Sequence, residues 1–175
     1  PGFIDLHTHS DLSFLIDANA QSKLRQGVTF ELAGNCGQSH ASPLAGASLE
    51  LLRSRAAQYP HPFDVNWSDF AGYLDALDAT RPTVNIAVQV GHSTIRSAVI
   101  GLEDRIPTRR EIDLMVGLTA ESLDGGAMGL STGLYYAPGI FARTGEVIEL
   151  AEMAAARGKL YSTHQRDEGA NNIGL

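Results

Sequence analysis

Three of the six histidines and the only cysteine stand where their side chains could bind a metal ion. His7 and His9 are two residues apart at the end of an apolar run, so in a strand both imidazoles point to the same side. Cys36 follows a second apolar run and lies between glycines, and His164 ends a later run. Imidazole and thiolate suit Zn²⁺, which lowers the pKa of a bound water to about 7. These residue types therefore predict a hydrolytic zinc site.

The other three histidines have less specific surroundings. His92 follows a further apolar run, and we expect it to form hydrogen bonds beside the metal site without being a ligand. His40 and His61 fall in a long polar connection, where a position on the surface is expected.

Apolar runs and amphipathic segments alternate along the chain, which predicts an α/β fold. The predicted strands are residues 3–9, 28–33, 84–90, 127–131 and 160–164. The predicted helices are residues 18–26, 49–57, 68–79, 108–123 and 145–157, several of them with capping residues. Because the helical connections are long enough for parallel crossovers, a parallel sheet is expected.

The spacing of these strands favours part of a barrel. Five strands occupy about 163 residues, so eight would need roughly 260, close to the usual length of a TIM-type (β/α)8 barrel. We expect residues 1–175 to be an incomplete barrel domain of about five βα units, cut at both ends. A doubly wound sheet is the alternative, but His7-Thr8-His9 stands where such folds carry a Gly-rich phosphate loop.

The composition argues against several classes of partner. The chain carries 13 Lys and Arg against 20 Asp and Glu, a net charge of −7, which disfavours nucleic acid and anionic membrane surfaces. One cysteine excludes an intramolecular disulfide, and no apolar run reaches the roughly 20 residues that span a bilayer. We therefore expect a cytoplasmic protein that acts on a small molecule. The oligomeric state is left open.

Five short motifs occur in the same order as in one family of metal-dependent hydrolases. They are residues 1–9 (PGFIDLHTH), 34–37 (GNCG), 90–96 (VGHSTIR), 129–139 (GLSTGLYYAPG) and 163–168 (THQRDE). Together they resemble the D-aminoacylase (N-acyl-D-amino-acid deacylase) family of the amidohydrolase superfamily. The first motif is shared across the superfamily, and the others narrow the resemblance to the deacylases. The resemblance covers nearly the whole chain and is weakest between Gln38 and Asn66.

The resemblance implies a metal-dependent (β/α)8 barrel accompanied by a small β-domain. Cys36 and His164 are then the ligands of a tight Zn²⁺ site, and His7 and His9 form a second, weaker metal site. A further ligand, the His after strand 6, is expected beyond Leu175. The general base, an Asp after strand 8, is expected there too, together with strands 6 to 8 and the β-domain.

The resemblance also implies hydrolysis of an N-acyl-D-amino acid to a carboxylate and a D-amino acid. Arg166 would bind the substrate carboxylate, with an ion pair to Asp167 or Glu168 as the alternative. Tyr135 or Tyr136 would donate a hydrogen bond to the scissile carbonyl or line the acyl pocket, and aromatic packing is equally consistent. Without the general base, residues 1–175 alone are expected to be inactive.

Two other functions stay open. An amidohydrolase acting on cyclic amides or dipeptides, of dihydroorotase, hydantoinase or isoaspartyl dipeptidase type, would keep His7 and His9. Such enzymes commonly carry a carboxylated Lys on strand 4, and residues 127–132 contain no Lys. The other possibility is a non-catalytic, metal-stabilised piece of a barrel. Residues 38–41 are also more polar than the family pattern, which leaves the local pocket wall open. The sequence does not give the preferred side chain or the acyl group.

Overall fold

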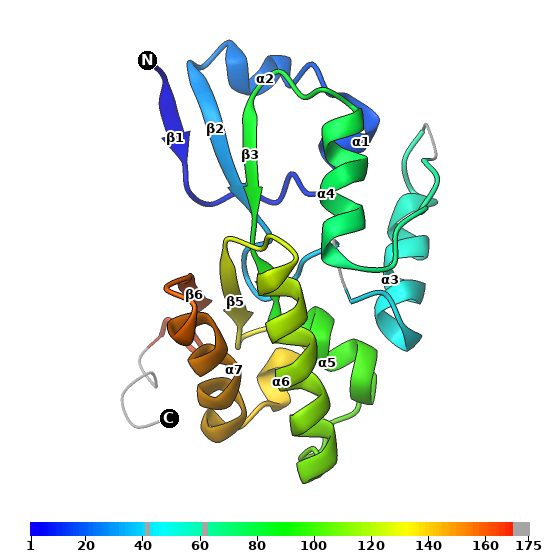
Figure 1. The fold of residues 1–175 in the computed structure, drawn as a ribbon, viewed down its shortest axis with the longest axis vertical. Helices are drawn as coiled ribbons and strands as arrows, with labels where there is room; N and C mark the ends of the chain where they lie inside the picture. The colour runs from blue at the N-terminus through cyan, green and yellow to red at the C-terminus, as the bar shows by residue number, and fades with distance from the viewer. Residues whose placement is uncertain (41–42, 61–62, 170–175) are drawn as a thin grey trace.

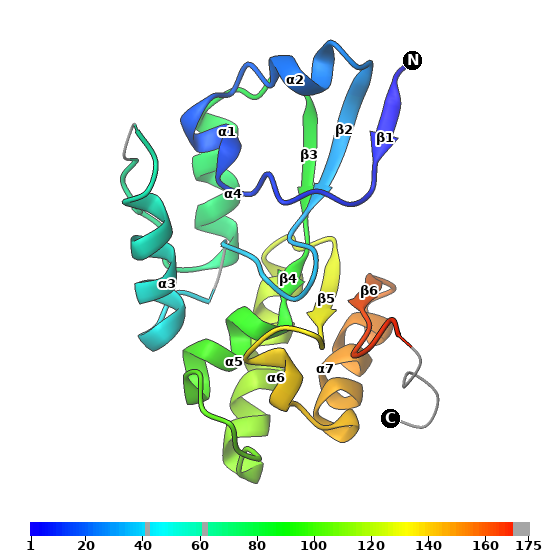
Figure 2. The ribbon, with the colours of Figure 1, turned by 180° about the vertical axis from the view of Figure 1, so that it is seen from behind.

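The computed structural model describes residues 1–40, 43–60 and 63–169, and its strands are all paired in parallel. Two three-stranded sheets follow the chain order β1-β2-β3 and β4-β5-β6. Their bounds are β1 Phe3–Asp5, β2 Val28–Ala33, β3 Asn85–Val88, β4 Val90–Gly91, β5 Gly129–Gly133 and β6 Leu160–His164. In Figure 1 the first sheet lies above the second, and Figure 2 shows β4 directly below β3.

The two sheets are joined through one interrupted strand. Only Gln89 separates β3 from β4, and its N–H donates to Ala33 O at 3.0 Å. On the other side of the same strand, Met128 N–H donates to Val88 O at 2.8 Å. Hydrogen bonding therefore passes in chain order from β1 to β6, as it does around a (β/α)8 barrel. The predicted α/β fold, a partial barrel, is confirmed.

Helices connect the strands and pack on them. Figures 1 and 2 agree that α6 and α7 cover one face of β5. The helices are α1 Ser13–Ile16, α2 Gln21–Leu24, α3 Gly46–Ala56, α4 Phe70–Ala79, α5 His92–Ile100, α6 Arg109–Asp124 and α7 Thr144–Ala156, with a short 3-10 turn η1 at Gly139–Phe141. In the described part of the chain, no helix has the length and apolar character needed to cross a membrane.

Local sequence signals explain where the longer helices begin. Thr108 accepts a hydrogen bond from Glu111 N–H, and the Glu111 carboxylate accepts one from Thr108 N–H, which is the predicted capping box of α6. Asp69 caps α4 by accepting from Gly72 N–H at 2.8 Å. Buried side chains of α6 and α7, Met115, Leu123 and Leu150 among them, then join one hydrophobic core with the strands.

The predicted helix over residues 18–26 is formed only in its middle, where α2 covers Gln21–Leu24, and the short helix α1 at Ser13–Ile16 was not predicted. Asp17, at the C-terminal end of α1, accepts with its carboxylate from the backbone and side-chain N–H groups of Asn19 and does not cap a helix beginning at residue 18. Helix α5 was not predicted either. It begins at His92 directly after β4, in a stretch of Ser, Thr and Ile residues whose helix propensity is modest.

The strands at the two ends of the strand order carry exposed apolar side chains. Phe3 and Ile4 of β1 are 71% and 64% exposed, and Leu160 of β6 is 50% exposed. Within the described residues, β1 and β6 each pair with only one neighbouring strand. The same edges carry the predicted metal ligands of the first and last strands, so the candidate site lies at the open side of the partial barrel.

Candidate metal centre

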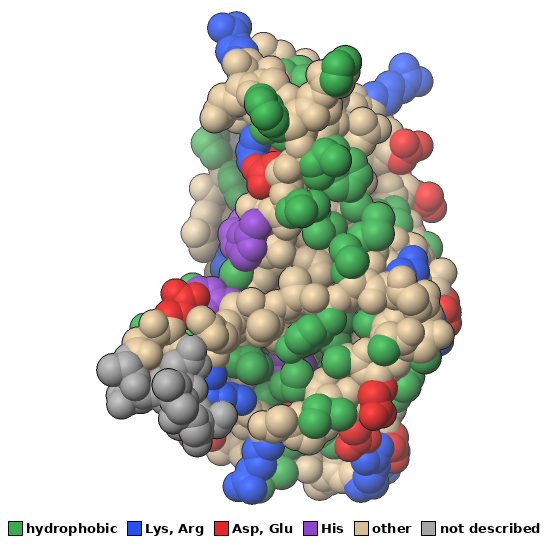
Figure 3. All heavy atoms as spheres, turned by 90° about the vertical axis from the view of Figure 1, so that its left-hand side faces the viewer, with side chains coloured by type: hydrophobic (Ala, Val, Ile, Leu, Met, Phe, Trp, Pro, Cys, Tyr) green, Lys and Arg blue, Asp and Glu red, His purple; other side chains and the backbone are tan. Residues whose placement is uncertain are grey.

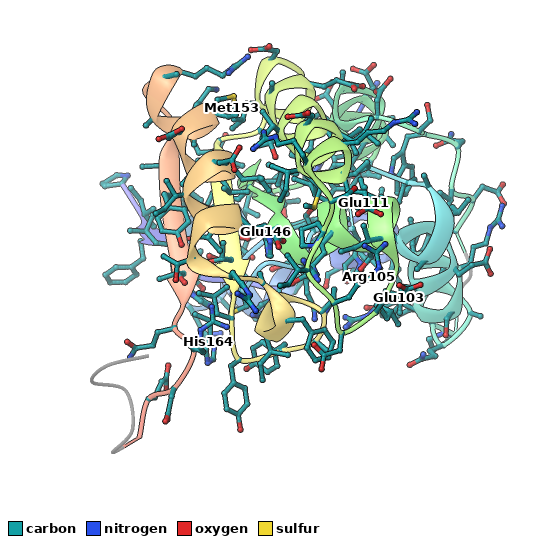
Figure 4. All side chains as sticks on the ribbon, turned by 90° about the horizontal axis from the view of Figure 1, so that it is seen from below. Glu103, Arg105, Glu111, Glu146, Met153 and His164 are labelled. Carbon is teal, nitrogen blue, oxygen red and sulfur yellow. The ribbon has the colours of Figure 1, made fainter. Side chains whose placement is uncertain are left out.

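The structure brings the four predicted ligands together after the carboxyl ends of β1, β2 and β6. The candidate ligand atoms of His7, His9 and Cys36 all lie within 4.8 Å of one another. Cys36 Sγ is 3.4 Å from His7 Nε2 and 3.6 Å from His164 Nδ1. Figure 4 labels His164 at the end of β6, and Figure 3 shows histidine side chains on the side of the molecule that carries the β1 edge.

These distances can be compared with those around a zinc ion. A Zn–S bond of about 2.3 Å and a Zn–N bond of about 2.0–2.1 Å at a tetrahedral angle place sulfur and nitrogen about 3.6 Å apart. The two measured separations, 3.4 and 3.6 Å, agree with that value. Because His7 and His9 are exposed while Cys36 is only 9% exposed, the cluster opens to solvent on its histidine side. The donor set thus fits a zinc site with room for water.

A tight turn presents the Cys36 thiol. Cys36 has φ 55°, and Gly34 and Gly37 on either side have φ 74° and 73°. Gly133 of β5 packs on this turn so closely that a Cβ there would lie 1.9 Å from Cys36 O. Gly34 and Gly37 thus allow the backbone conformation that the turn requires, and Gly133 allows β5 to pack closely against it.

Side chains from neighbouring elements hold the same turn. Ser131 of β5 donates its hydroxyl to Gly34 O and accepts from Gly37 N–H at 3.1 Å. Asn35 donates to Leu32 O at 2.8 Å and accepts from the Gln89 amide at 3.0 Å. Every one of these groups is buried. The position of the thiol is therefore fixed by both sheets. The only sequence signal for this role of Ser131 is that it lies in the motif of residues 129–139.

The two predicted tyrosines pack around His164. The Tyr136 ring meets the imidazole edge-on at a centroid distance of 4.9 Å, and Tyr135 stacks on it at 5.9 Å. The Nε2 atom of His164, on the side away from Cys36, lies 3.5 Å from a Glu168 carboxylate oxygen. A carboxylate on the second ring nitrogen orients a metal-bound histidine and makes it more basic. These contacts fix His164 with Nδ1 toward the thiol.

Arg166 is held by backbone carbonyl groups. Its guanidinium donates to Ile140 O at 2.9 Å and to Ala142 O at 3.0 Å. In the part of the chain that the structure describes, it forms no ion pair with Asp167 or Glu168, so that alternative is wrong. The contacts anchor the loop that carries Tyr135 and Tyr136 to the strand that carries His164.

The comparison with known proteins agrees with this geometry. Residues 1–162 match the model of the amidohydrolase family. The chain belongs to the amidohydrolase family.

Relatives with a named activity show which amidohydrolases this chain resembles. A D-aminoacylase of Alcaligenes xylosoxydans xylosoxydans is 45% identical over 177 residues, covering 99% of the chain and 35% of the relative. A solved D-aminoacylase, described for its binuclear metal centre with one-metal activation and second-metal attenuation, has a TM-score of 0.84 at 40% identity, covering 99% of this chain and 36% of that one. The resemblance to the D-aminoacylase family is thus confirmed.

A second solved structure is similar over the same length. N-acyl-D-glutamate deacylase from Bordetella bronchiseptica, complexed with zinc and a phosphonate inhibitor, has a TM-score of 0.82 at 38% identity, covering 98% of this chain and 35% of that one. The amidohydrolase chain described here therefore spans about a third of the length of the relatives that it matches.

Electrostatics at the cluster of this amidohydrolase favour a neutral His9 imidazole and a protonated Cys36 thiol before a metal binds. Burial, with a smaller effect from Glu168, raises the pKa of Cys36. Burial also lowers the pKa of His9, and the charges of His7 and Arg55 lower it further. Because only the thiolate binds zinc, metal binding must release a proton from Cys36.

His92, expected beside the metal site, belongs to a separate buried cluster. Its Nε2 lies 2.8 Å from a Glu146 carboxylate oxygen, and Arg96 donates to the other oxygen at 2.6 Å. All three side chains are at most 2% exposed. Burial alone would raise the pKa of Glu146, but His92 and Arg96 together hold it below its usual value. Figure 4 labels Glu146 on the inner side of α7.

His40, which we expected on the surface, is partly exposed and contacts a charged side chain, and His61 lies outside the described residues. His40 is half-buried, and its Nε2 lies 3.3 Å from Nη1 of Arg55. Because a guanidinium can only donate, the imidazole accepts at Nε2 and carries its proton on Nδ1. Burial, together with the charge of Arg55, lowers the pKa of His40 to about 4, which keeps it neutral at physiological pH.

Proposed function

We propose that the full-length protein hydrolyses the amide bond of N-acyl-D-amino acids with the help of zinc. The observation that carries this proposal is the convergence of Cys36 Sγ with His7 Nε2 at 3.4 Å and with His164 Nδ1 at 3.6 Å. The named relatives support the substrate class, since they are a D-aminoacylase and an N-acyl-D-glutamate deacylase.

We assign Cys36 and His164 to the tight zinc site and His7 and His9 to a second, weaker one. A bound zinc ion supplies Lewis-acid activation of the amide carbonyl and of a water molecule. Tyr136 and Tyr135 keep the His164 ring in place, and their exposed faces, 40% and 56% accessible, are available to line the acyl pocket.

Arg166 remains our candidate for binding the substrate carboxylate. Its two donors to Ile140 O and Ala142 O hold the guanidinium in a fixed position, and the side chain is half-buried. A planar guanidinium that is already oriented loses less entropy when it pairs with a carboxylate. Mutation of Arg166 to Ala should raise the Michaelis constant for N-acyl-D-amino acids, and an unchanged constant would argue against this role.

We place residues 1–175 as the first five βα units of the catalytic barrel. The remaining ligand, a His after strand 6, and the general base, an Asp after strand 8, then come from the rest of the protein, as do the small β-domain and strands 6 to 8. On this proposal residues 1–175 alone bind metal weakly and do not turn over substrate. We also propose a cytoplasmic location, where the Cys36 thiol stays reduced.

The direct test is amino-acid release from racemic N-acetylmethionine by the zinc-loaded full-length protein, resolved by chiral chromatography. Release of D-methionine alone supports the deacylase. Release of neither enantiomer contradicts it, and assays on a cyclic amide and on an isoaspartyl dipeptide would then distinguish the other amidohydrolase activities from a non-catalytic role.

A further inference from the structure

A cavity of about 170 Å³ lies between α3 and α5, next to the turn that carries Cys36. Its walls come from the segment after β2, from both helices and from the loop after β5. Most of its surface is apolar, and leucines and a proline supply it: Leu44, Leu51, Leu52, Leu102 and Pro138. An engineered cavity of about 150 Å³ in another protein holds one benzene molecule, so this space fits a group of about six or seven heavy atoms.

One cationic side chain, Arg55 of α3, stands at the wall of this cavity. Its Nη2 donates to the Gln38 side-chain oxygen at 3.1 Å, and its Nη1 donates to His40 Nε2 at 3.3 Å. Both partners are neutral acceptors, and in the described part of the chain Arg55 takes part in no ion pair. The guanidinium is thus oriented by neutral groups, and no described carboxylate lies within 4.0 Å of it, although its charge acts on the buried Asp11 carboxyl.

A second polar group in the cavity wall has no partner. Ser93 of α5 lines the cavity and is 3% exposed, and its Oγ forms no hydrogen bond among the described residues. A buried hydroxyl without a partner is destabilising, because the hydrogen bond that it forms with water in the unfolded chain is not replaced. A ligand that accepts a hydrogen bond from Ser93 would remove that cost, so this group, independently of Arg55, points to a polar ligand.

The cavity is also close to the candidate metal centre. Ser93 N–H donates to Gly37 O at 2.8 Å, and Gly37 directly follows Cys36. The charge of Arg55 is one of the groups that act on His9. A substrate held at the metal centre could therefore place a short substituent into this cavity.

We propose that this cavity binds a carboxylate at the end of a short apolar chain on the substrate, with the carboxylate on Arg55 and the methylene groups against the leucines. The inference rests on the proposed deacylase function and specifies its substrate class. Such a carboxylate could come from the side chain of an acidic D-amino acid or from a dicarboxylic acyl group such as succinyl. Both place a charged group about two methylenes from the rest of the molecule.

Two matched substrate pairs separate these sources in the full-length zinc enzyme. One pair is N-acetyl-D-glutamate and N-acetyl-D-glutamine. The other is N-succinyl-D-methionine and N-succinamoyl-D-methionine, in which the free carboxylate of the succinyl group is replaced by an amide. In one pair the wild-type enzyme should favour the charged member, and Arg55→Met should lower kcat/KM for that member about 10- to 100-fold, as expected for one charged hydrogen bond. The neutral member should change less than about twofold, and the pair that responds identifies the source.

Arg53→Met is the matched control, because Arg53 lies on the same helix and pairs with Glu50 at 3.1 Å on the exposed face. It should leave all four rates unchanged. Arg55→Lys, which keeps the charge but loses the two-pronged geometry, should retain part of the preference. Equal losses for both members of each pair in Arg55→Met, or no charge preference in the wild-type enzyme, would overturn the proposal.

Binding of free glutarate, measured by calorimetry, gives a readout that does not need turnover. Wild-type protein should bind glutarate more tightly than glutaramate, and Arg55→Met should abolish the difference. Ser93→Ala should weaken the binding of glutarate several-fold. Glutarate binding through Arg55 without hydrolysis of any of the four substrates would contradict the deacylase function alone. Hydrolysis of all four without charge preference, together with no preference for glutarate, would contradict the cavity proposal alone.

Discussion

Two histidine-containing clusters in this protein use the same residue type in opposite ways. At the metal centre, His7 and His9 are exposed and lie close to the Cys36 thiol, and in the described part of the chain neither imidazole forms an ion pair with a carboxylate. In the buried cluster around Glu146 of α7, the side chains of His92 and Arg96 are fully buried and each contacts one of the two carboxylate oxygens. The first arrangement leaves ligand atoms free to meet an ion, whereas the second satisfies its charges internally.

The difference shows that the partners of a histidine, more than its place at a strand end, decide its role. His92 lies at the end of a strand as His164 does, yet it begins helix α5 and turns toward α7. A buried carboxylate paired with a cation is costly to break, because the remaining charge has no solvent to stabilise it. The buried cluster should therefore control stability and the metal centre should control activity.

The largest effect on stability is expected when Glu146 is removed from the buried cluster. Glu146→Ala leaves Arg96 buried without a counter-ion and should lower the free energy of unfolding by about 3–5 kcal/mol. Denaturant unfolding of the full-length protein measures this change. Glu149→Ala on the same helix, which removes an exposed pair with Arg109, is the control and should barely move the midpoint. Equal effects of the two substitutions would mean that the buried cluster is not structural.

At the metal centre, Cys36→Ala should act on activity and leave the fold intact. Loss of a direct ligand should lower turnover by more than about 100-fold, since even groups that only orient a ligand cost about 10- to 100-fold. Metal content by mass spectrometry should fall in parallel, while the unfolding midpoint of the metal-free protein stays near that of the wild type. A Cys36→Ala protein with full zinc content and full activity would rule out our ligand assignment.

A smaller effect should follow from crowding the turn that carries the thiol. Gly133→Ala would place a methyl group against Cys36 O, so the turn must shift and the thiol with it. We expect weaker zinc binding, by about 10-fold. Gly117→Ala is the control, because a Cβ there meets nothing within 4 Å. It should leave zinc binding unchanged and stabilise α6 slightly.

Lowering the pH should disrupt the two clusters one after the other. Protons compete with the metal for the Cys36 thiolate, whose pKa is raised by burial, so zinc should dissociate first as the pH falls. Glu146 has a pKa below its ordinary value of 4.5, so its stabilising effect is present above that pH and is lost as the pH falls further. Zinc content and circular dichroism followed together from pH 7 to 3 should show two transitions in this order. One coincident transition would mean that the metal holds the fold together.

Much of the fold could be predicted because its signals are local. Alternation of apolar runs with capped amphipathic segments identified the five strands, counting β3 and β4 as one, and most of the helices. Thr108 and Glu111 form their predicted capping box because both partners lie within one turn of chain. The prediction failed for α1, for the residues on either side of α2 and for α5. Asp17 bonds to Asn19 instead of capping a longer helix, and packing, not propensity, makes residues 92–100 helical.

Sequence alone determined the chemistry available to this protein: two histidines on one side of a strand, one cysteine between glycines and a later histidine in a recognisable motif. Only the tertiary structure decided which of these groups meet. It placed Cys36 between His7 and His164 and paired His92 with Glu146. It also placed Arg55, whose hydrogen-bond partners are neutral, beside a cavity. The physical reason is that residue type and spacing fix local geometry, whereas contacts across more than a hundred residues depend on how the parallel strands are packed together.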